Sequence, residues 1–153
     1  MLRELTTNQK GLLAETAITW VAVRLGIGVA RPLDDERYDL ILDLGSDLLR
    51  VQCKWAARHG DVVVVRCGTC RRSREGLIHR GYRRGEFDAI AAYCAELDTC
   101  YLLPTSMSVN RAAVQLRLAP ARNNQRSGIH WASDYDLSAR LACPGPMAQL
   151  GER

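Results

Sequence analysis

The chain has 153 residues, of which 47% are apolar and 25% are charged, and its formal net charge is +4. This length allows one domain with a substantial core and is short for two, so we expect residues 1–153 to form a single domain. No apolar run reaches the roughly 20 residues that a membrane span needs, and no signal peptide is evident. We therefore expect a cytoplasmic protein that does not contact a membrane.

The basic side chains are almost all arginine, since Lys10 and Lys54 are the only lysines. Arginine binds phosphate bidentately and pairs with guanine edges, so this bias favours a nucleic-acid partner. A GC-rich genome would produce the same bias. It would not explain why the arginines cluster, nor why Lys54 is retained.

Residues 67–70 form a single C-x-x-C motif, with His59 and His79 as the nearby histidines. A structural zinc site needs four well-spaced ligands, and a second C-x-x-C motif is missing. We therefore expect no zinc, and thiols that stay free in a reducing cytoplasm.

The first predicted element is a helix, because Thr6 and Gln9 have the spacing of a capping box and Gly26 is a plausible stop. At about 100° per residue, Glu15 projects among uncharged side chains. It is either a surface glutamate or a carboxylate turned inward toward a metal ion. We favour the second interpretation, because an isolated charge on an otherwise uncharged helix face suggests a functional role.

Residues 38–44 and 48–55 both alternate between polar and apolar, and Gly45-Ser46-Asp47 between them predicts a turn. This pattern indicates a β-hairpin. A two-residue turn at Ser46-Asp47 would place Asp39 opposite Lys54, with Gln52 as a diagonal neighbour of Asp39. A carboxylate, an amide and an ammonium group would then meet on one face. A cross-strand ion pair between Asp39 and Lys54 would be the purely structural alternative.

A second turn at 59–61 and the apolar run 62–65 predict the next strand. The segment from 66 to 84 then carries seven arginines, several glycines and Tyr82, with Glu75 as its one acid. This composition is typical of a loop or β-ribbon that becomes ordered on a phosphate backbone, although a solvated basic loop has the same composition. The arginines are Arg66, Arg71, Arg72, Arg74, Arg80, Arg83 and Arg84.

Apolar residues at helical spacing predict a helix from Glu86 to Leu97, with Asp88 in its first turn in a structural role. Strands are expected at 100–103 and 114–118, a helix near 133–141, and a frayed tail over 143–153. The polar loop 120–128 between them is a candidate base-reading or backbone-gripping segment. Its candidate DNA-binding residues are Arg122, Asn124, Gln125 and Arg126.

The hairpin carries Asp39 and then Gln52-Cys53-Lys54, and Glu15 lies on the preceding helix. In this order and spacing the residues resemble the PD-(D/E)XK nuclease superfamily. The resemblance is closest to its branch of group I intron-associated homing endonucleases, which tolerates Gln at the second acidic position. It continues at 87–88, 93–94, 101–104, 115–118, 124–125, 128–129, 132 and 135. The sequence departs from the family pattern at Tyr38, where a glycine or proline is usual near the first Asp.

This resemblance implies an α/β fold of the restriction-endonuclease type, with a central mixed sheet flanked by helices. It implies an endonuclease that uses Mg²⁺, or Mn²⁺ in its place, to hydrolyse double-stranded DNA. The implied ligands are Asp39, Gln52, Glu15 and the backbone carbonyl of Cys53, and Lys54 would orient or activate the attacking water. A junction-resolvase-like nuclease and a DNA-binding module that has lost catalysis are the alternatives. Cutting both strands also predicts a homodimer or homotetramer.

Overall fold

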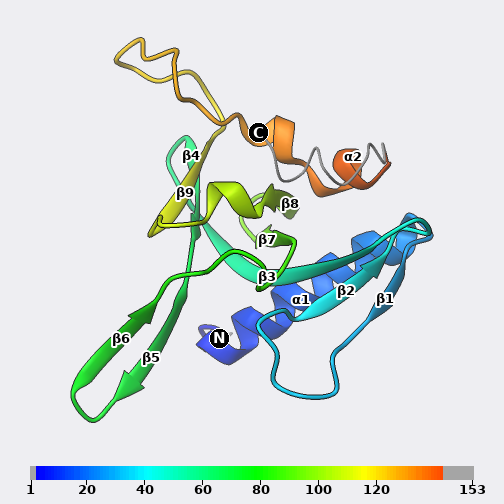
Figure 1. The fold of residues 1–153 in the computed structure, drawn as a ribbon. Helices are drawn as coiled ribbons and strands as arrows, with labels where there is room; N and C mark the ends of the chain where they lie inside the picture. Colours follow the sequence, from blue (N-terminus) through cyan, green and yellow to red (C-terminus); the bar gives the residue numbers. More distant parts are fainter. Residues whose placement is uncertain (1–2, 143–153) are drawn as a thin grey trace.

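The computed structural model describes residues 3–142 (Figure 1). The predicted frayed tail, 143–153, lies outside this range. In chain order the helical elements are α1 (Thr7–Arg24), η1 (Thr105–Met107), η2 (Ala132–Tyr135) and α2 (Leu137–Ala142). The strands are β1 (Gly28–Ala30), β2 (Leu40–Asp43), β3 (Leu48–His59), β4 (Val62–Arg66), β5 (Thr69–Ser73), β6 (Gly76–Arg80), β7 (Ala89–Cys94), β8 (Thr99–Pro104) and β9 (Ala113–Arg117).

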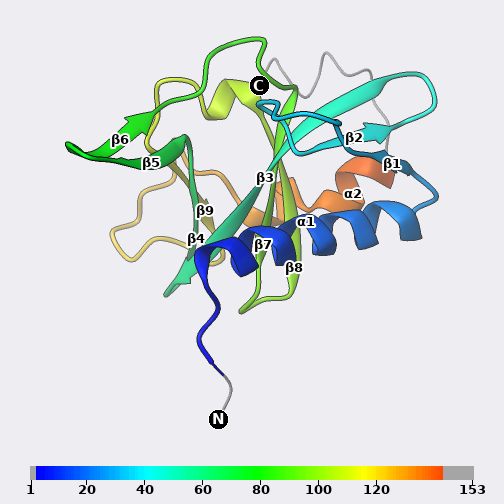
Figure 2. The same ribbon diagram turned by 90° about the horizontal axis from the view of Figure 1, so that it is seen from below.

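A mixed sheet built around β3 forms the centre of the molecule. The order β1-β2-β3-β4-β9 is antiparallel throughout, whereas β7 runs parallel to β3 and pairs with β8 on its far side. Strands β5 and β6 form a separate two-stranded ribbon that projects from the body, as both ribbon views show (Figures 1 and 2). The predicted mixed sheet flanked by helices is thus confirmed.

The pairing of β3 leaves a gap along one of its edges. Strand β7 occupies one edge of β3 from Val51 to Ala56, so β2 and β4 must share the other edge. Pairing with β2 ends at Val51, and pairing with β4 begins at Ala56. Residues 52–55 therefore have no strand beside them on this edge within the described part of the chain. The predicted Gln52-Cys53-Lys54 motif lies in this gap.

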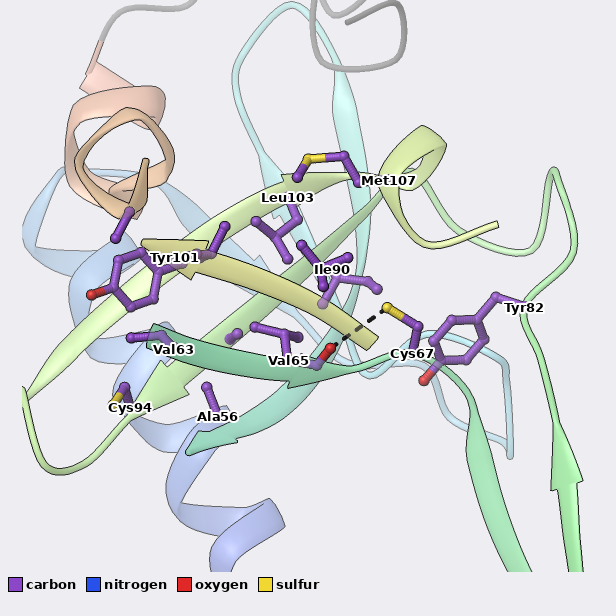
Figure 3. Packing of buried hydrophobic residues seen from close by; sticks show 14 of the residues in the cluster. Ala56, Val63, Val65, Cys67, Tyr82, Ile90, Cys94, Tyr101, Leu103 and Met107 are labelled. Atoms are coloured by element: carbon purple, nitrogen blue, oxygen red, sulfur yellow. Dashed lines mark hydrogen bonds between the residues drawn. The ribbon is translucent and has the colours of Figure 1, made fainter. Parts of the chain in front are cut away.

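Two apolar clusters cover the two faces of the sheet. One face of β2, β3 and β7 packs against α1 and α2, with Ile18, Leu40 and Leu137 fully buried. On the other face, β4 and β9 pack against β7 and β8, and Figure 3 shows this cluster reaching from Tyr101 to Tyr82. Burial on both faces fixes the position of β3, and with it the position of the motif residues.

The first helix begins and ends as the sequence predicts. The Thr6 backbone N–H donates to Gln9 Oε1 at 2.9 Å and the Gln9 N–H donates to Thr6 Oγ1 at 3.2 Å, which is a complete capping box. Gly26 follows the last turn with a φ of +79°. Ala14 and Ile18 face the sheet. Within residues 3–142, no helix is long and apolar enough to cross a membrane.

The helix predicted for Glu86 to Leu97 is wrong, because this segment contains strand β7. Every residue of β7 except Tyr93 is buried, since the strand lies between β3 and β8 and has core on both faces. A strand buried on both sides does not alternate, and its apolar spacing therefore resembles that of a buried helix. The final helix predicted near 133–141 is present as η2 followed by α2.

Candidate active site

The predicted hairpin is present, but its predicted register is wrong by two residues. Leu40 pairs with Val51 and Asp43 pairs with Leu48, so the same register continues to place Asp39 opposite Gln52 instead of Lys54. The connection is a four-residue loop, in which the Asp43 carboxylate accepts the Gly45 N–H at 2.9 Å. Gly45 has a φ of +87°, which glycine adopts without steric cost.

Asp39 directly precedes β2, at the point where the gap in β3 begins. Its backbone N–H donates to the Val51 carbonyl at 2.9 Å, and its Oδ2 accepts the Cys53 N–H at 2.8 Å. The carboxylate thus replaces the strand that would otherwise satisfy this N–H. Because the N–H and C=O of one strand residue point to the same edge, the Cys53 carbonyl is directed into the same gap. Burial raises the pKa of Asp39, and the nearby Glu15 carboxylate adds to this effect.

Glu15 reaches this region from α1. Its Oε2 accepts a hydrogen bond from Arg31 Nη1 at 2.7 Å, and its side chain is only 22% exposed. The helix presents Ala14 to the core, so the neighbouring Glu15 side chain lies at the border of the buried face. The Glu15 carboxylate thus lies close enough to help raise the pKa of Asp39, and Arg31 is its hydrogen-bond partner.

Lys54 lies in the same gap and has two partners at the base of the β5–β6 ribbon. Its Nζ donates to the Gly68 carbonyl at 2.7 Å and lies 5.2 Å from the centre of the Tyr82 ring. Burial lowers the pKa of Lys54, while the Asp39 carboxylate opposes this change. The ammonium group is thus held by the base of the ribbon, close enough to Asp39 for the two charges to interact.

Gln52 is half-buried and shares a face of β3 with Lys54. The register of β2 and β3, extended by one residue beyond Leu40 and Val51, places Gln52 opposite Asp39. Within the described residues, no three His, Cys, Asp or Glu side chains gather as a metal site. Two carboxylates, one amide and one backbone carbonyl nevertheless offer the oxygen ligands that Mg²⁺ prefers.

The sequence profile of the PD-(D/E)XK endonuclease family matches residues 5–138, which include every residue of this site. The chain belongs to this family. It is therefore a nuclease, as the resemblance implied, with a fold of the restriction-endonuclease type.

Among solved structures, this PD-(D/E)XK chain is similar to the bacterial homing endonuclease I-Ssp6803I. The TM-score is 0.71 with 28% sequence identity, and the match covers 90% of this chain and 93% of the other. The similarity therefore extends over nearly the whole of both proteins. No curated protein matches the sequence.

The arginine-rich segment of this PD-(D/E)XK nuclease is a β-ribbon, one of the two forms expected. Strand β6 is exposed along its whole length, and Arg66, Arg74, Arg83 and Arg84 are also exposed. Arg71 and Arg72 lie on β5 at the positions paired with Ile78 and Leu77. Arg80 forms an ion pair with Glu86 at 3.2 Å, so part of its charge is already compensated.

The second predicted DNA-binding segment follows β9 at the opposite end of the β4–β9 pair. The ribbon continues from Arg66, whereas the loop leaves near Leu118, whose N–H donates to the Asp61 carbonyl. Both segments project on the side of the molecule where β4 and β9 lie (Figures 1 and 2). The four candidate residues of the loop are exposed; they are Arg122, Asn124, Gln125 and Arg126.

The sequence does not reveal the roles of three residues around the site. Arg31 pairs with Glu15, and the Gly68 carbonyl and the Tyr82 ring hold Lys54. Tyr82 is noticeable in sequence as the one aromatic residue among the ribbon arginines. Its contact with Lys54 depends on how the ribbon returns to the sheet, which no local pattern reveals. Asp88 does not lie in the first turn of a helix as expected, because no helix is present there in the described chain, and its carboxylate instead accepts the Arg50 backbone N–H at 2.8 Å.

Proposed function

We propose that this protein is a metal-dependent endonuclease that hydrolyses phosphodiester bonds in double-stranded DNA, in the manner of a site-specific homing endonuclease. One observation carries the proposal. Glu15 on α1 and Asp39 just before β2 lie near the open stretch of β3 that carries Gln52 and Lys54. A merely structural ion pair between Asp39 and Lys54 would need neither the gap nor the second carboxylate.

The residues around the gap fit a hard divalent ion such as Mg²⁺, for which Mn²⁺ could substitute. Asp39, Glu15, the Gln52 amide oxygen and the Cys53 carbonyl would hold it. The bound ion would supply Lewis acidity and neutralise charge that develops on the phosphate oxygens. Burial raises the pKa of Asp39 in the metal-free protein, and a bound cation would favour the ionised carboxylate instead.

Hydrolysis adds one water oxygen to the phosphorus and breaks one bridging P–O bond. Lys54 carries three N–H donors, of which the Gly68 carbonyl takes one. We assign to the others the orientation of the attacking water and the stabilisation of charge on the phosphate. The position of Lys54 beside Asp39 supports this role, because both groups then act on the same phosphate.

DNA would be held by the ribbon and by the loop after β9. These arms leave opposite ends of a five-residue strand pair, so together they span more of a duplex than either would alone. Exposed arginines contribute phosphate contacts, and Asn124 and Gln125 are suited to pair with adenine edges. We further propose that no zinc is bound, since Cys67 is buried while Cys70 is exposed on the ribbon.

Gln52 favours a second candidate, a DNA-binding module that has lost catalysis, because an amide replaces the usual acid. Incubation of supercoiled plasmid with the protein in Mg²⁺ and in Ca²⁺ separates the two. A nuclease should nick or linearise the plasmid in Mg²⁺ and bind it without cleavage in Ca²⁺. Binding without cleavage in both ions, and in Mn²⁺, would support the decayed module.

A junction-resolvase-like activity is the remaining alternative within the nucleases. Competition in the plasmid assay distinguishes a junction resolvase from a homing-type enzyme. The competitors are a four-way junction and a linear duplex of equal length. A homing-type enzyme should cleave particular duplex sites and be inhibited little by the junction. Preferential cleavage of the junction at its branch would favour the resolvase.

A further inference from the structure

The ribbon that we expect to bind DNA meets the active-site lysine at its base. Gly68 directly precedes β5, and Tyr82 follows β6 by two residues, so the two ends of the ribbon come together there. Lys54 Nζ donates to the Gly68 carbonyl at 2.7 Å, and Tyr82 Oη donates to the same carbonyl at 3.3 Å. One carbonyl thus joins the lysine of β3 to both ends of the ribbon.

Tyr82 is fixed much more firmly than the ribbon that it closes. Its side chain is 4% exposed, and its ring packs edge-on against Phe87 with centroids 4.8 Å apart. Figure 3 shows Tyr82 next to Cys67 at the edge of the apolar cluster, where the ribbon departs. The Lys54 ammonium lies 5.2 Å from the ring centroid, within the range of a cation–π interaction.

The position of Gly68 is also narrowly defined. Its φ is +121°, which L side chains rarely adopt, and a Cβ atom there would lie 2.9 Å from the Arg80 carbonyl oxygen. Only glycine therefore lets the two ends of the ribbon approach closely enough for its carbonyl to reach Lys54.

From these contacts we infer that Tyr82 is a positioning residue for Lys54, and that the base of the ribbon aligns the lysine with the reacting phosphate. This inference rests on the proposed nuclease function. DNA that moves or orders the ribbon would act directly on the Gly68 carbonyl. The ribbon base would thus align Lys54 for the chemical step while the arginines of the ribbon supply the phosphate contacts.

The test compares Tyr82→Leu with Tyr101→Leu, the same substitution at the other end of the same cluster, which is also 4% exposed. Single-turnover cleavage at saturating DNA in Mg²⁺ measures the chemical step, and DNA affinity in Ca²⁺ measures binding. Tyr82→Leu should slow cleavage by about tenfold or more with the affinity within about twofold of wild type. Tyr101→Leu should lower the melting temperature but leave the cleavage rate at saturation near wild type.

Tyr82→Phe keeps the ring over Lys54 and should restore most of the rate. In the Lys54→Ala background, Tyr82→Leu should cause no further loss, because the group that it positions is gone. An equal further loss in that background, or equal slowing by Tyr101→Leu, would overturn the inference. Lys54→Ala cleaving at the wild-type rate would instead overturn the proposed role of Lys54, and the inference with it.

Gly68→Ala is the second variant, for the case that Tyr82→Leu does not fold. It leaves the cluster intact and displaces the carbonyl that Lys54 contacts. Its cleavage rate at saturating DNA should fall by about fivefold or more, again with no further loss when combined with Lys54→Ala. A wild-type rate for Gly68→Ala would show that this carbonyl does not align the lysine.

Discussion

The neutral amide of Gln52 would limit the negative charge that the proposed site presents before DNA arrives. Glu15 and Asp39 would be its two carboxylate ligands, and Arg31 partly compensates the charge of Glu15. A site with an amide in place of a third carboxylate should bind Mg²⁺ weakly until a DNA phosphate joins it.

Gln52→Glu adds a charge next to Asp39, and we expect two opposite effects on binding. The free protein should bind Mg²⁺ or Mn²⁺ more tightly, while metal-free binding of DNA should weaken through repulsion of the phosphates. Calorimetric titration of the metal ion, and separately of metal-free DNA, into wild type and Gln52→Glu measures these effects. Gln115→Glu, which places the same charge at the one exposed position of β9, is the matched control for net charge. Identical titrations for Gln52→Glu and wild type would remove Gln52 from the site.

Asp39 should cost the metal-free protein stability at neutral pH, because burial raises its pKa above the ordinary value of 3.8. A carboxyl whose folded-state pKa is raised favours folding below its unfolded-state pKa, and this contribution is lost as pH rises through the folded-state value. Asp39→Asn should therefore raise the melting temperature in a chelator at pH 7, and the gain should shrink as the solution is acidified toward pH 4. Asp61→Asn, in the exposed turn before β4, is the control. It should change neither the melting temperature at pH 7 nor the dependence of the melting temperature on pH. A melting temperature for Asp39→Asn below that of wild type at pH 7 would contradict this account.

At the scale of elements, the hairpin shows what a local pattern can and cannot predict. Alternation placed Gln52 and Lys54 on one face of a strand, and a register error of two residues leaves that face unchanged. The contacts of Asp39 were not predictable in the same way, since they depend on a four-residue loop stabilised by Asp43. Strand β7 was mistaken for a helix because its environment, rather than its own sequence, determines its conformation.

The ribbon should provide a large share of the electrostatic affinity for DNA. Each phosphate contact contributes about −0.9 to the log–log slope of affinity against salt, so replacing Arg71, Arg72 and Arg74 by alanine should flatten the slope by up to about three units. Fluorescence anisotropy across a salt series measures this slope. The control replaces Arg3, Arg24 and Arg140 by alanine, which removes the same charge. These three residues lie outside the ribbon and outside the loop after β9. An equal loss of slope in the two triple variants would show that the ribbon is not the interface.

At the scale of the whole molecule, the described chain presents one candidate active site, whereas a double-strand break requires two cuts. A two-fold axis relating two copies would supply the second site, so we expect a homodimer, or a homotetramer built as a dimer of dimers. Multi-angle light scattering of the free protein and of its DNA complex measures the mass directly. A monomer under both conditions would contradict this expectation.

If the gap in β3 is a catalytic site that contains Lys54, a comparison of the two lysines of the chain should show it. Lys54→Ala and Lys10→Ala remove the same group, one from the gap and one from α1. The measurement is single-turnover cleavage in Mg²⁺ at saturating DNA, with DNA affinity determined in Ca²⁺. Lys54→Ala should cleave at least about 100-fold more slowly with nearly unchanged affinity, and Lys10→Ala should behave as wild type. Cleavage by Lys54→Ala at the wild-type rate would place the active site elsewhere.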